Sequence, residues 1–219
     1  MILKDYQRKV LECTKDFLVE LYARREKVAR IREVDTEMAD SVDWVKQAFD
    51  AVAPGRYVRP RENGIGEKLP NFCLKVPTGG GKTLLATRTI DLVNTHYRHN
   101  QRGLVLWIVP TTQIYRQTLL ALKDRDHPYR QQLDMASAGR TLILEKGSGF
   151  SPADVEDHLC VLILMLPSAN RQTKETLRMF RDSGGFDRFF PREDDHAAHE
   201  ALLKEVPNLD TFDKESGFW

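Results

Sequence analysis

Six consecutive residues carry the groups that can hold a triphosphate: Thr78, Gly79, Gly80, Gly81, Lys82 and Thr83. Glycines let backbone N–H groups point inward around phosphate oxygens, and the N-terminus of a following helix adds partial positive charge. The ammonium group of Lys82 would reach the β- and γ-phosphates, and the hydroxyl of Thr83 would coordinate Mg²⁺. The residue types and their spacing therefore predict a P-loop that binds ATP and Mg²⁺.

The flanking sequence favours this interpretation. The apolar run 72–76 before the loop is typical of a strand, and the stretch that begins with Leu84 is typical of a helix. The strict pattern G-x-x-x-x-G-K-S/T has a small residue where this chain has Val76. The alternative is a glycine-rich turn between a strand and a helix with an exposed lysine, and the strand–loop–helix context makes it the weaker interpretation.

A second group of polar residues follows the apolar run 103–109, namely Pro110, Thr111, Thr112 and Gln117. Hydroxyl groups and helix N-terminal amides at the carboxyl end of a strand suit the phosphate backbone of a nucleic acid, which accepts hydrogen bonds without revealing sequence. The alternative is a helix after a core strand, capped by Thr112. The preceding P-loop pattern favours the nucleic-acid contact.

Gln7 is the third candidate, within the segment Leu3-Lys4-Asp5-Tyr6-Gln7. An amide side chain can pair with both the donor and the acceptor on the edge of an adenine. The alternative is an ordinary polar residue on the surface of a helix.

The pattern of apolar residues predicts the elements that position these groups. Strands rich in apolar residues alternate with amphipathic helices, which predicts an α/β fold with a parallel sheet covered on both faces, a three-layer arrangement. Residues 53–70 contain three prolines and three glycines and are predicted to form a loop. The predicted helices are 1–30, 36–51, 82–97, 113–122, 172–180 and 196–204, and the predicted strands are 72–76, 103–109, 141–144 and 160–164.

Composition limits the class of protein. The 219 residues carry a net charge of +1, so no overall basic field indicates nucleic-acid binding. The three cysteines, Cys13, Cys73 and Cys160, are predicted to be reduced core residues of a cytosolic protein. The N-terminus lacks the pattern of a signal peptide, and the longest apolar run, 159–167, is too short to span a bilayer. We therefore expect a cytoplasmic protein that does not bind membranes.

Together these segments resemble the first motor domain of superfamily 2 nucleic-acid helicases and translocases. The P-loop, preceded by Pro77, is especially similar to bacterial DEAD/DEAH-box proteins related to the Res subunit of type III restriction enzymes. The resemblance covers most of residues 1–183. It implies an incomplete RecA-like P-loop NTPase domain with an N-terminal helical extension.

The resemblance also implies roles for individual residues. Residues 78–83 match the motif that binds ATP and Mg²⁺, and Gln7 matches the glutamine that reads adenine. Pro110, Thr111 and Thr112, with Gln117, match a motif that contacts the nucleic-acid backbone. Further strand contacts are implied for Ser168, Asn170 and Arg171. The implied partners are DNA and a modification subunit or another subunit of a defence system.

The resemblance and the composition divide the chain into three predicted regions. Residues 1–70 form the helical region with the glutamine motif and a linker, 71–183 the RecA-like core, and 184–219 a helical or irregular segment. From Gln7 to Lys82 the chain advances 82 − 7 = 75 positions, which is long for compact members of the family. An inserted helix at 36–51 would account for the excess.

Two parts of the family pattern are missing from these residues. No Asp-Glu dipeptide occurs in the chain to hold Mg²⁺ and orient the attacking water, and no Gln-x-x-Gly-Arg motif occurs either. The acidic cluster 192–196 is interpreted as a helix N-cap. We expect that the parent protein continues beyond Trp219, and that these 219 residues bind ATP weakly or not at all and do not hydrolyse it. No lysine has Asp or Glu two positions before it, so a nuclease centre of the Asp/Glu-x-Lys type is excluded here.

Three functions remain open from the sequence. The chain is the ATP-binding part of a DNA-dependent motor, a P-loop module that switches without translocating, or a P-loop kinase; the residues after position 109 favour the motor. Two weaker clusters also have two interpretations each. His196, His199 and Glu200 form either a metal site or, as we favour, a solvated face. The basic loop with Tyr57 is either a nucleic-acid contact or a surface loop, and its arginines are Arg56, Arg59 and Arg61.

Overall fold

The computed structural model describes residues 3–57, 59–63, 66–166, 186–192 and 194–206. The chain divides into two compact units. The first, here called the helical unit, comprises Met1–Gln101 and Asp124–Gly139, and the second, the sheet unit, comprises Arg102–Lys123 and Arg140–Trp219. The region boundaries predicted at residues 70 and 183 stay predictions.

The helical unit is built around one long helix, α1 (Asp5–Arg32). Its buried residues recur at intervals of three, four and seven, which places them along one stripe of the helix: Gln7, Thr14, Phe17, Leu18, Leu21 and Val28. The central part of this stripe packs with Val45 and Ala48 of α3 (Trp44–Val52) to form the core of the unit. The predicted long N-terminal helix is therefore confirmed.

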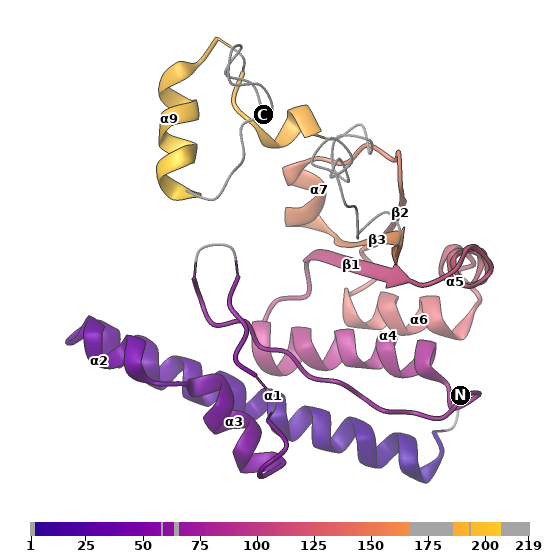
Figure 1. Ribbon diagram of the computed structural model, residues 1–219. Helices are drawn as coiled ribbons and strands as arrows, with labels where there is room; N and C mark the ends of the chain where they lie inside the picture. Colours follow the sequence, from indigo (N-terminus) through magenta and orange to yellow (C-terminus); the bar gives the residue numbers. More distant parts are fainter. Residues whose placement is uncertain (1–2, 58, 64–65, 167–185, 193, 207–219) are drawn as a thin grey trace. The chain divides into compact units, whose positions relative to one another are not determined.

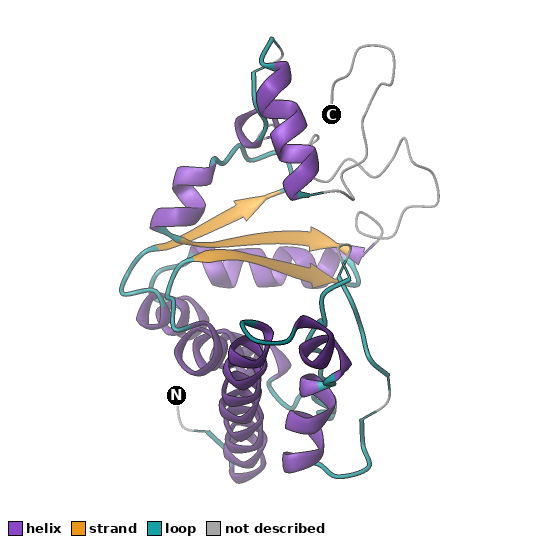
Figure 2. Ribbon diagram, turned by 90° about the vertical axis from the view of Figure 1, so that its left-hand side faces the viewer, coloured by secondary structure: helices purple, strands orange, loops and turns teal. Residues whose placement is uncertain are grey.

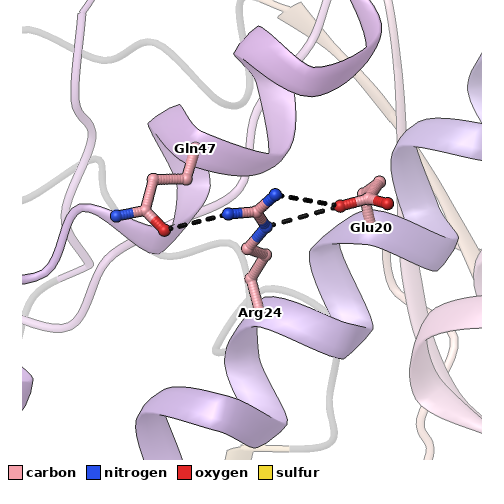
Figure 3. Close-up of polar contacts among 3 residues, drawn as sticks. All are labelled: Glu20, Arg24 and Gln47. Atoms are coloured by element: carbon pink, nitrogen blue, oxygen red, sulfur yellow. Dashed lines mark hydrogen bonds and ion pairs between the residues drawn. The ribbon is translucent and has the colours of Figure 1, made fainter.

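The helix that carries the glycine loop completes the unit. This helix, α4 (Lys82–Val93), continues into a π-helical turn, Asn94–Arg98, so the predicted helix over 82–97 is confirmed. It lies between α1 and α6 (Pro128–Ala136), and Figure 1 shows the three helices stacked in this order. A polar contact also joins α1 to α3, because the guanidinium of Arg24 bonds both Glu20 and Gln47 (Figure 3).

The single helix predicted over 36–51 is wrong in one respect. The structure has two helices there, α2 (Thr36–Ser41) and α3, each with an aspartate at its N-cap. The Asp43 carboxylate accepts a hydrogen bond from the backbone N–H of Lys46 at 2.9 Å, which begins a new helix two residues after α2 ends. The Asp43 cap therefore divides residues 36–51 into two helices, although the spacing of the apolar residues predicts one.

The sheet unit contains a parallel sheet of three strands in the order β1-β3-β2, seen side by side in Figure 2. The strands are β1 (Gly103–Val109), β2 (Thr141–Glu145) and β3 (Leu159–Met165). Both pairings are parallel, with Trp107 opposite Ile163 and Glu145 opposite the same residue. The central strand is buried along nearly its whole length, as its continuous apolar sequence predicts.

Helices cover both faces of this sheet. On one face, Val155 of α7 (Pro152–Asp157) packs against the cluster that contains Cys160, Leu162 and Leu164. On the other, α5 (Thr112–Lys123) reaches the sheet through Tyr115 and Lys123, which both contact Glu145. Since side chains alternate along a strand, Ile163 and Glu145 lie on the face opposite Leu162 and Leu164. The prediction of a parallel α/β sheet is confirmed.

The strand predicted over 72–76 is wrong. Residues 69–77 have no regular secondary structure, although the exposure of their side chains alternates along 71–77 as in an extended chain. Phe72 packs instead on Phe17 of α1, edge to face, with 5.6 Å between ring centroids. The apolar residues of this run anchor the chain to the helical core, and this accounts for a strand-like pattern without strand pairing.

The remaining elements are short. The C-terminal helix α9 (His196–Glu205) follows a 3₁₀ turn, Phe186–Phe189, and is capped by the Asp195 carboxylate as predicted. Helices α6 and α7 are not predicted by the sequence pattern, and the helix predicted over 172–180 lies outside the described residues. Among those residues, no helix has the length and apolar composition needed to cross a bilayer.

The cysteines are free, but only one of them belongs to a core. Cys160 is buried in β3, whereas Cys13 and Cys73 are exposed, so the prediction that all three are core residues is wrong for these two. Cys13 lies on the outer face of α1, and Cys73 lies on an exposed position of the extended run.

Candidate nucleotide-binding site

The glycine loop is a tight turn that ends on a helix N-terminus. The backbone N–H of Gly80 donates to the Pro77 carbonyl at 3.0 Å, which closes a four-residue turn. Gly79, at the third position of this turn, has a φ of 74°, a value that type II turns reserve for glycine. Gly81 has a φ of 78° and is the N-cap of α4, whose first residue is Lys82.

The sign of φ alternates along the loop, because Gly79 and Gly81 are left-handed and Gly80 between them is not. Successive residues of opposite handedness turn their N–H groups toward a common side and form an anion-binding concavity. The N-terminus of α4 adds its partial positive charge at the same point. The backbone therefore fits a phosphate chain.

The two side chains predicted to contact phosphate and metal lie on the first turn of α4. Lys82 is exposed, and its ammonium donates to the Pro77 carbonyl at 3.0 Å, the same oxygen that closes the turn. An ammonium has three N–H donors, so this contact leaves two for phosphate oxygens. Thr83 follows directly and is half-buried.

Gln7 lies against the glycine loop, although 73 positions separate it from Gly80. Its Nε2 donates to the Gly80 carbonyl at 2.9 Å, and its Oε1 accepts from the backbone N–H of Lys4 at 2.9 Å. The side chain is buried, in contrast to the alternative of a surface residue. The sequence prediction and the geometry therefore bring Gln7 to the same loop, while the predicted contact with adenine stays a prediction.

Sequence reasoning missed Tyr6. Its hydroxyl donates to the Gly80 carbonyl at 2.9 Å, beside the bond from Gln7. The only signal in the sequence is its position next to Gln7, because a tyrosine at the start of an amphipathic helix is otherwise ordinary.

In the sheet unit, the residues after β1 are exposed at the carboxyl end of the strand: Pro110, Thr111, Thr112 and Gln117. The cap of α5 is Thr111 and not Thr112, because the Thr111 hydroxyl oxygen accepts from the backbone N–H of Ile114 at 3.3 Å. The Thr112 hydroxyl lies 3.5 Å from the Met165 sulfur, a weak contact. The Thr111 hydroxyl therefore caps the helix, whereas the Thr112 hydroxyl makes only this weak contact.

One turn further along α5, Tyr115 lies 3.5 Å from a Glu145 carboxylate oxygen, and Lys123 pairs with the same carboxylate. Burial, followed by the nearby negative charge of Glu145, raises the pKa of the Tyr115 hydroxyl. These contacts fix α5 to the end of β2. They leave Gln117 exposed on the helix.

The other predicted contacts divide into two groups. Ser168, Asn170 and Arg171 lie outside the described residues. In the basic loop, Tyr57 is half-buried in the core of the helical unit, tilted against Phe49 with 5.6 Å between ring centroids. Burial raises the pKa of its hydroxyl. The aromatic ring is therefore already packed and not free to stack on a base, while Arg56, Arg59 and Arg61 are exposed.

No group of three His, Cys, Asp or Glu side chains is placed to hold a metal ion within the described ranges. His199, one of the residues considered for a metal, has its Nε2 3.0 Å from the Arg192 carbonyl oxygen. His196 and Glu200 are exposed on α9.

Comparison with known proteins agrees with the geometry of the loop. No curated protein and no solved structure matches the chain. A family model described as "Type III restriction enzyme, res subunit" matches residues 1–184, which includes Gln7, the glycine loop and all three strands. This family has a P-loop NTPase fold and forms the N-terminal domain of superfamily 2 helicases. The chain belongs to the res subunit family of type III restriction enzymes.

Proposed function

We propose that this chain is the ATP-binding N-terminal portion of the first motor domain of a DNA-dependent ATPase, a restriction-type DNA translocase. One observation carries the proposal: a loop with left-handed glycines at 79 and 81 delivers Lys82 to the exposed first turn of α4. Membership of the res subunit family supports the same function.

In this proposal the loop binds the triphosphate of ATP. The backbone N–H groups of Gly79 and Gly81 and the Lys82 ammonium surround the β- and γ-phosphates. The Thr83 hydroxyl is a ligand of Mg²⁺, which neutralises charge on the phosphates when bound. Gln7 contributes from α1, where it touches the loop.

DNA binds at the carboxyl end of β1 in this proposal. The residues exposed there are Pro110, Thr111, Thr112 and Gln117. Hydroxyl and amide groups can donate hydrogen bonds to the phosphate oxygens of a nucleic-acid backbone. Ser168, Asn170 and Arg171 extend the contact by resemblance to the family. The protein acts in the cytoplasm, alongside a modification subunit or another subunit of a defence system.

Hydrolysis needs a group that this sequence does not contain. The family uses an Asp-Glu pair at the end of a strand to hold Mg²⁺ and orient water, and these 219 residues have no such dipeptide. We therefore expect these 219 residues to bind ATP weakly or not at all, with no turnover above that of Lys82→Ala. Removing the Lys82 ammonium costs about 1.5–3 kcal/mol of nucleotide affinity, roughly a tenfold to hundredfold loss.

The deciding experiment is the DNA-stimulated ATPase activity of the full-length gene product, with Lys82→Ala as the control. Stimulation by DNA that Lys82→Ala abolishes supports a motor. If ATP binding depends on Lys82 but DNA does not stimulate ATP hydrolysis, the protein is a P-loop switching module and not a motor. Phosphate transfer to a small-molecule acceptor would indicate a kinase and contradict the proposal.

A further inference from the structure

The start of α1 meets the glycine loop at one atom, the carbonyl oxygen of Gly80. Two donors from neighbouring residues converge on it, the Tyr6 hydroxyl and the Gln7 amide, each at 2.9 Å. A carbonyl oxygen has two lone pairs, so these bonds use its full capacity as an acceptor. Contact between side chains 73 and 74 positions away and a single backbone atom is a specific device for holding that peptide group.

The orientation of this carbonyl determines the direction of the next N–H. All the described peptide bonds are trans, and in a planar trans peptide the C=O and the N–H point in opposite directions. Holding the Gly80 oxygen toward α1 therefore turns the Gly81 N–H away from α1. A peptide between two glycines has little steric resistance to rotation, so an external hold has a large effect on its orientation.

From this geometry we infer that Tyr6 is a positioning residue, which together with Gln7 fixes the Gly80–Gly81 peptide so that its N–H is presented to a phosphate oxygen. The inference rests on the proposed function and assigns the Tyr6–Gln7 pair a role that does not depend on the base of the nucleotide. Tyr6 acts through the loop and does not touch the ligand itself.

The bonds of Gln7 support a role in the loop over recognition of adenine. Both ends of its amide are engaged, Oε1 with the Lys4 N–H and Nε2 with Gly80. One N–H of Nε2 and one lone pair of Oε1 remain, but the residue is only 5% exposed, which leaves little access for a base. The side chain also lies so close to the loop that a β-carbon at Gly81 would come within 2.6 Å of its Nε2.

Tyr6 offers a clean test, because the residue is 38% exposed and its hydroxyl can be removed without opening a core cavity. The probes are MgATP and magnesium tripolyphosphate, which has the phosphate chain without a base or sugar. Each is titrated calorimetrically into the full-length gene product in the absence of DNA. We expect Tyr6→Phe to weaken both probes by the same factor, about two- to tenfold, as loss of one neutral hydrogen bond predicts.

The matched control is Tyr22→Phe, which removes a tyrosine hydroxyl from the same helix, four turns further along, where the ring contacts His99 and Arg25. This variant should bind both probes as the wild type does. A second readout in the ligand-free protein is the amide ¹H–¹⁵N resonance of Gly81, which should move in Tyr6→Phe and stay in place in Tyr22→Phe. Neither measurement depends on catalysis.

The outcomes separate this inference from the proposed function. Equal weakening of both probes in Tyr6→Phe and in Gln7→Ala supports it. Weakening of MgATP alone in Gln7→Ala, with tripolyphosphate unchanged, would assign Gln7 to the base and overturn it. Wild-type affinity in Tyr6→Phe together with a loss in Lys82→Ala overturns the inference and keeps the P-loop, whereas a wild type that binds neither probe overturns both.

Discussion

A methyl carbon of Val76 occupies the space where a side chain at Gly80 would have to lie. A β-carbon on residue 80 would come within 2.5 Å of Val76 Cγ1 and within 2.8 Å of the Pro77 carbonyl oxygen. Val76 stands where the P-loop pattern has a small residue, so the extra volume at 76 falls against the loop itself. The loop accommodates this valine because position 80 has no side chain.

We predict that Gly80→Ala destabilises the protein by about 1–3 kcal/mol and abolishes the fit of the loop to phosphate. The cause is packing and not backbone strain, because Gly80 is not in the left-handed region. Gly79→Ala should destabilise the protein by a similar amount, roughly 1–2 kcal/mol, but through backbone strain and not packing. Gly79 has a φ of 74°, and a β-carbon added there would meet nothing within 4 Å. Chemical denaturation measures both.

A second substitution distinguishes the packing clash in Gly80→Ala from the backbone strain in Gly79→Ala. Val76→Ala should recover part of the stability lost in Gly80→Ala, because it removes one of the two clashing atoms and leaves the Pro77 carbonyl. It should recover nothing in Gly79→Ala. Equal recovery in both backgrounds would contradict the proposed contact between Val76 and Gly80.

Gly81→Ala tests the contact with Gln7 in the same way. The new β-carbon would lie 2.6 Å from Gln7 Nε2, and φ at this position is 78°, so the variant suffers both a clash and backbone strain. We predict that Gln7→Ala costs less stability in the Gly81→Ala background than in the wild type, because the clash has already displaced the amide. A double-mutant cycle measures the coupling, expected at about 0.5–3 kcal/mol, and additive effects would mean that the two residues do not touch.

Continuous apolar runs gave reliable predictions where the sheet buries both faces of a strand. The bounds of β1 match those predicted, and β3 is one residue longer at each end. A continuous apolar run such as 159–165 is typical of a parallel strand that is buried on both faces. The run 72–76 has a similar pattern but forms no strand, since Phe72 packs on Phe17. Local pattern does not distinguish burial against a helix from burial in a sheet.

The glycine loop and Gln7 were also identified from sequence, but their contact was not. Residue types alone indicate the backbone freedom that Gly79 and Gly81 use, because a left-handed φ favours glycine, whereas the roles of the loop and Lys82 in binding ATP stay predictions. The convergence of Tyr6 and Gln7 on Gly80 depends on how α1 packs beside α4, a tertiary relationship between segments far apart in the chain. Short helices such as α6 and α7 escaped prediction because nine and six residues show too little periodicity.

The contact between α1 and α3 in Figure 3 should contribute little to stability. The Arg24 guanidinium lies 3.3–3.4 Å from a Glu20 carboxylate oxygen and 3.2 Å from Gln47 Oε1, and the side chains of the ion pair are 36% and 41% exposed. Water screens such pairs, so we predict that Arg24→Ala costs less than about 1 kcal/mol. Leu21→Ala, one turn away in the buried stripe, should cost about 2–5 kcal/mol.

Urea denaturation of the two variants measures this difference, and a third variant tests its cause. Arg24→Gln keeps a shorter, uncharged polar side chain and should fall between Arg24→Ala and the wild type. A cost for Arg24→Ala equal to that for Leu21→Ala would mean that polar contacts, rather than the apolar stripe, hold α1 to α3.

The three cysteines should differ sharply in reactivity in the native protein. Burial, and after it the nearby charge of Asp154, raises the pKa of the Cys160 thiol to about 11, and its sulfur donates to the Asp154 carbonyl at 3.3 Å. The thiolate is the reactive form, so at pH 8 only about one part in a thousand of Cys160 is ionised, and that part is shielded from reagent. Cys13 and Cys73 are exposed.

Iodoacetamide at pH 8 should therefore alkylate Cys13 and Cys73 and spare Cys160, as peptide mass spectrometry measures. In guanidinium chloride all three should react, because unfolding removes both the burial and the raised pKa. Modification of Cys160 in the native protein at the rate of the other two would mean that β3 opens to solvent, which its central place between β1 and β2 argues against.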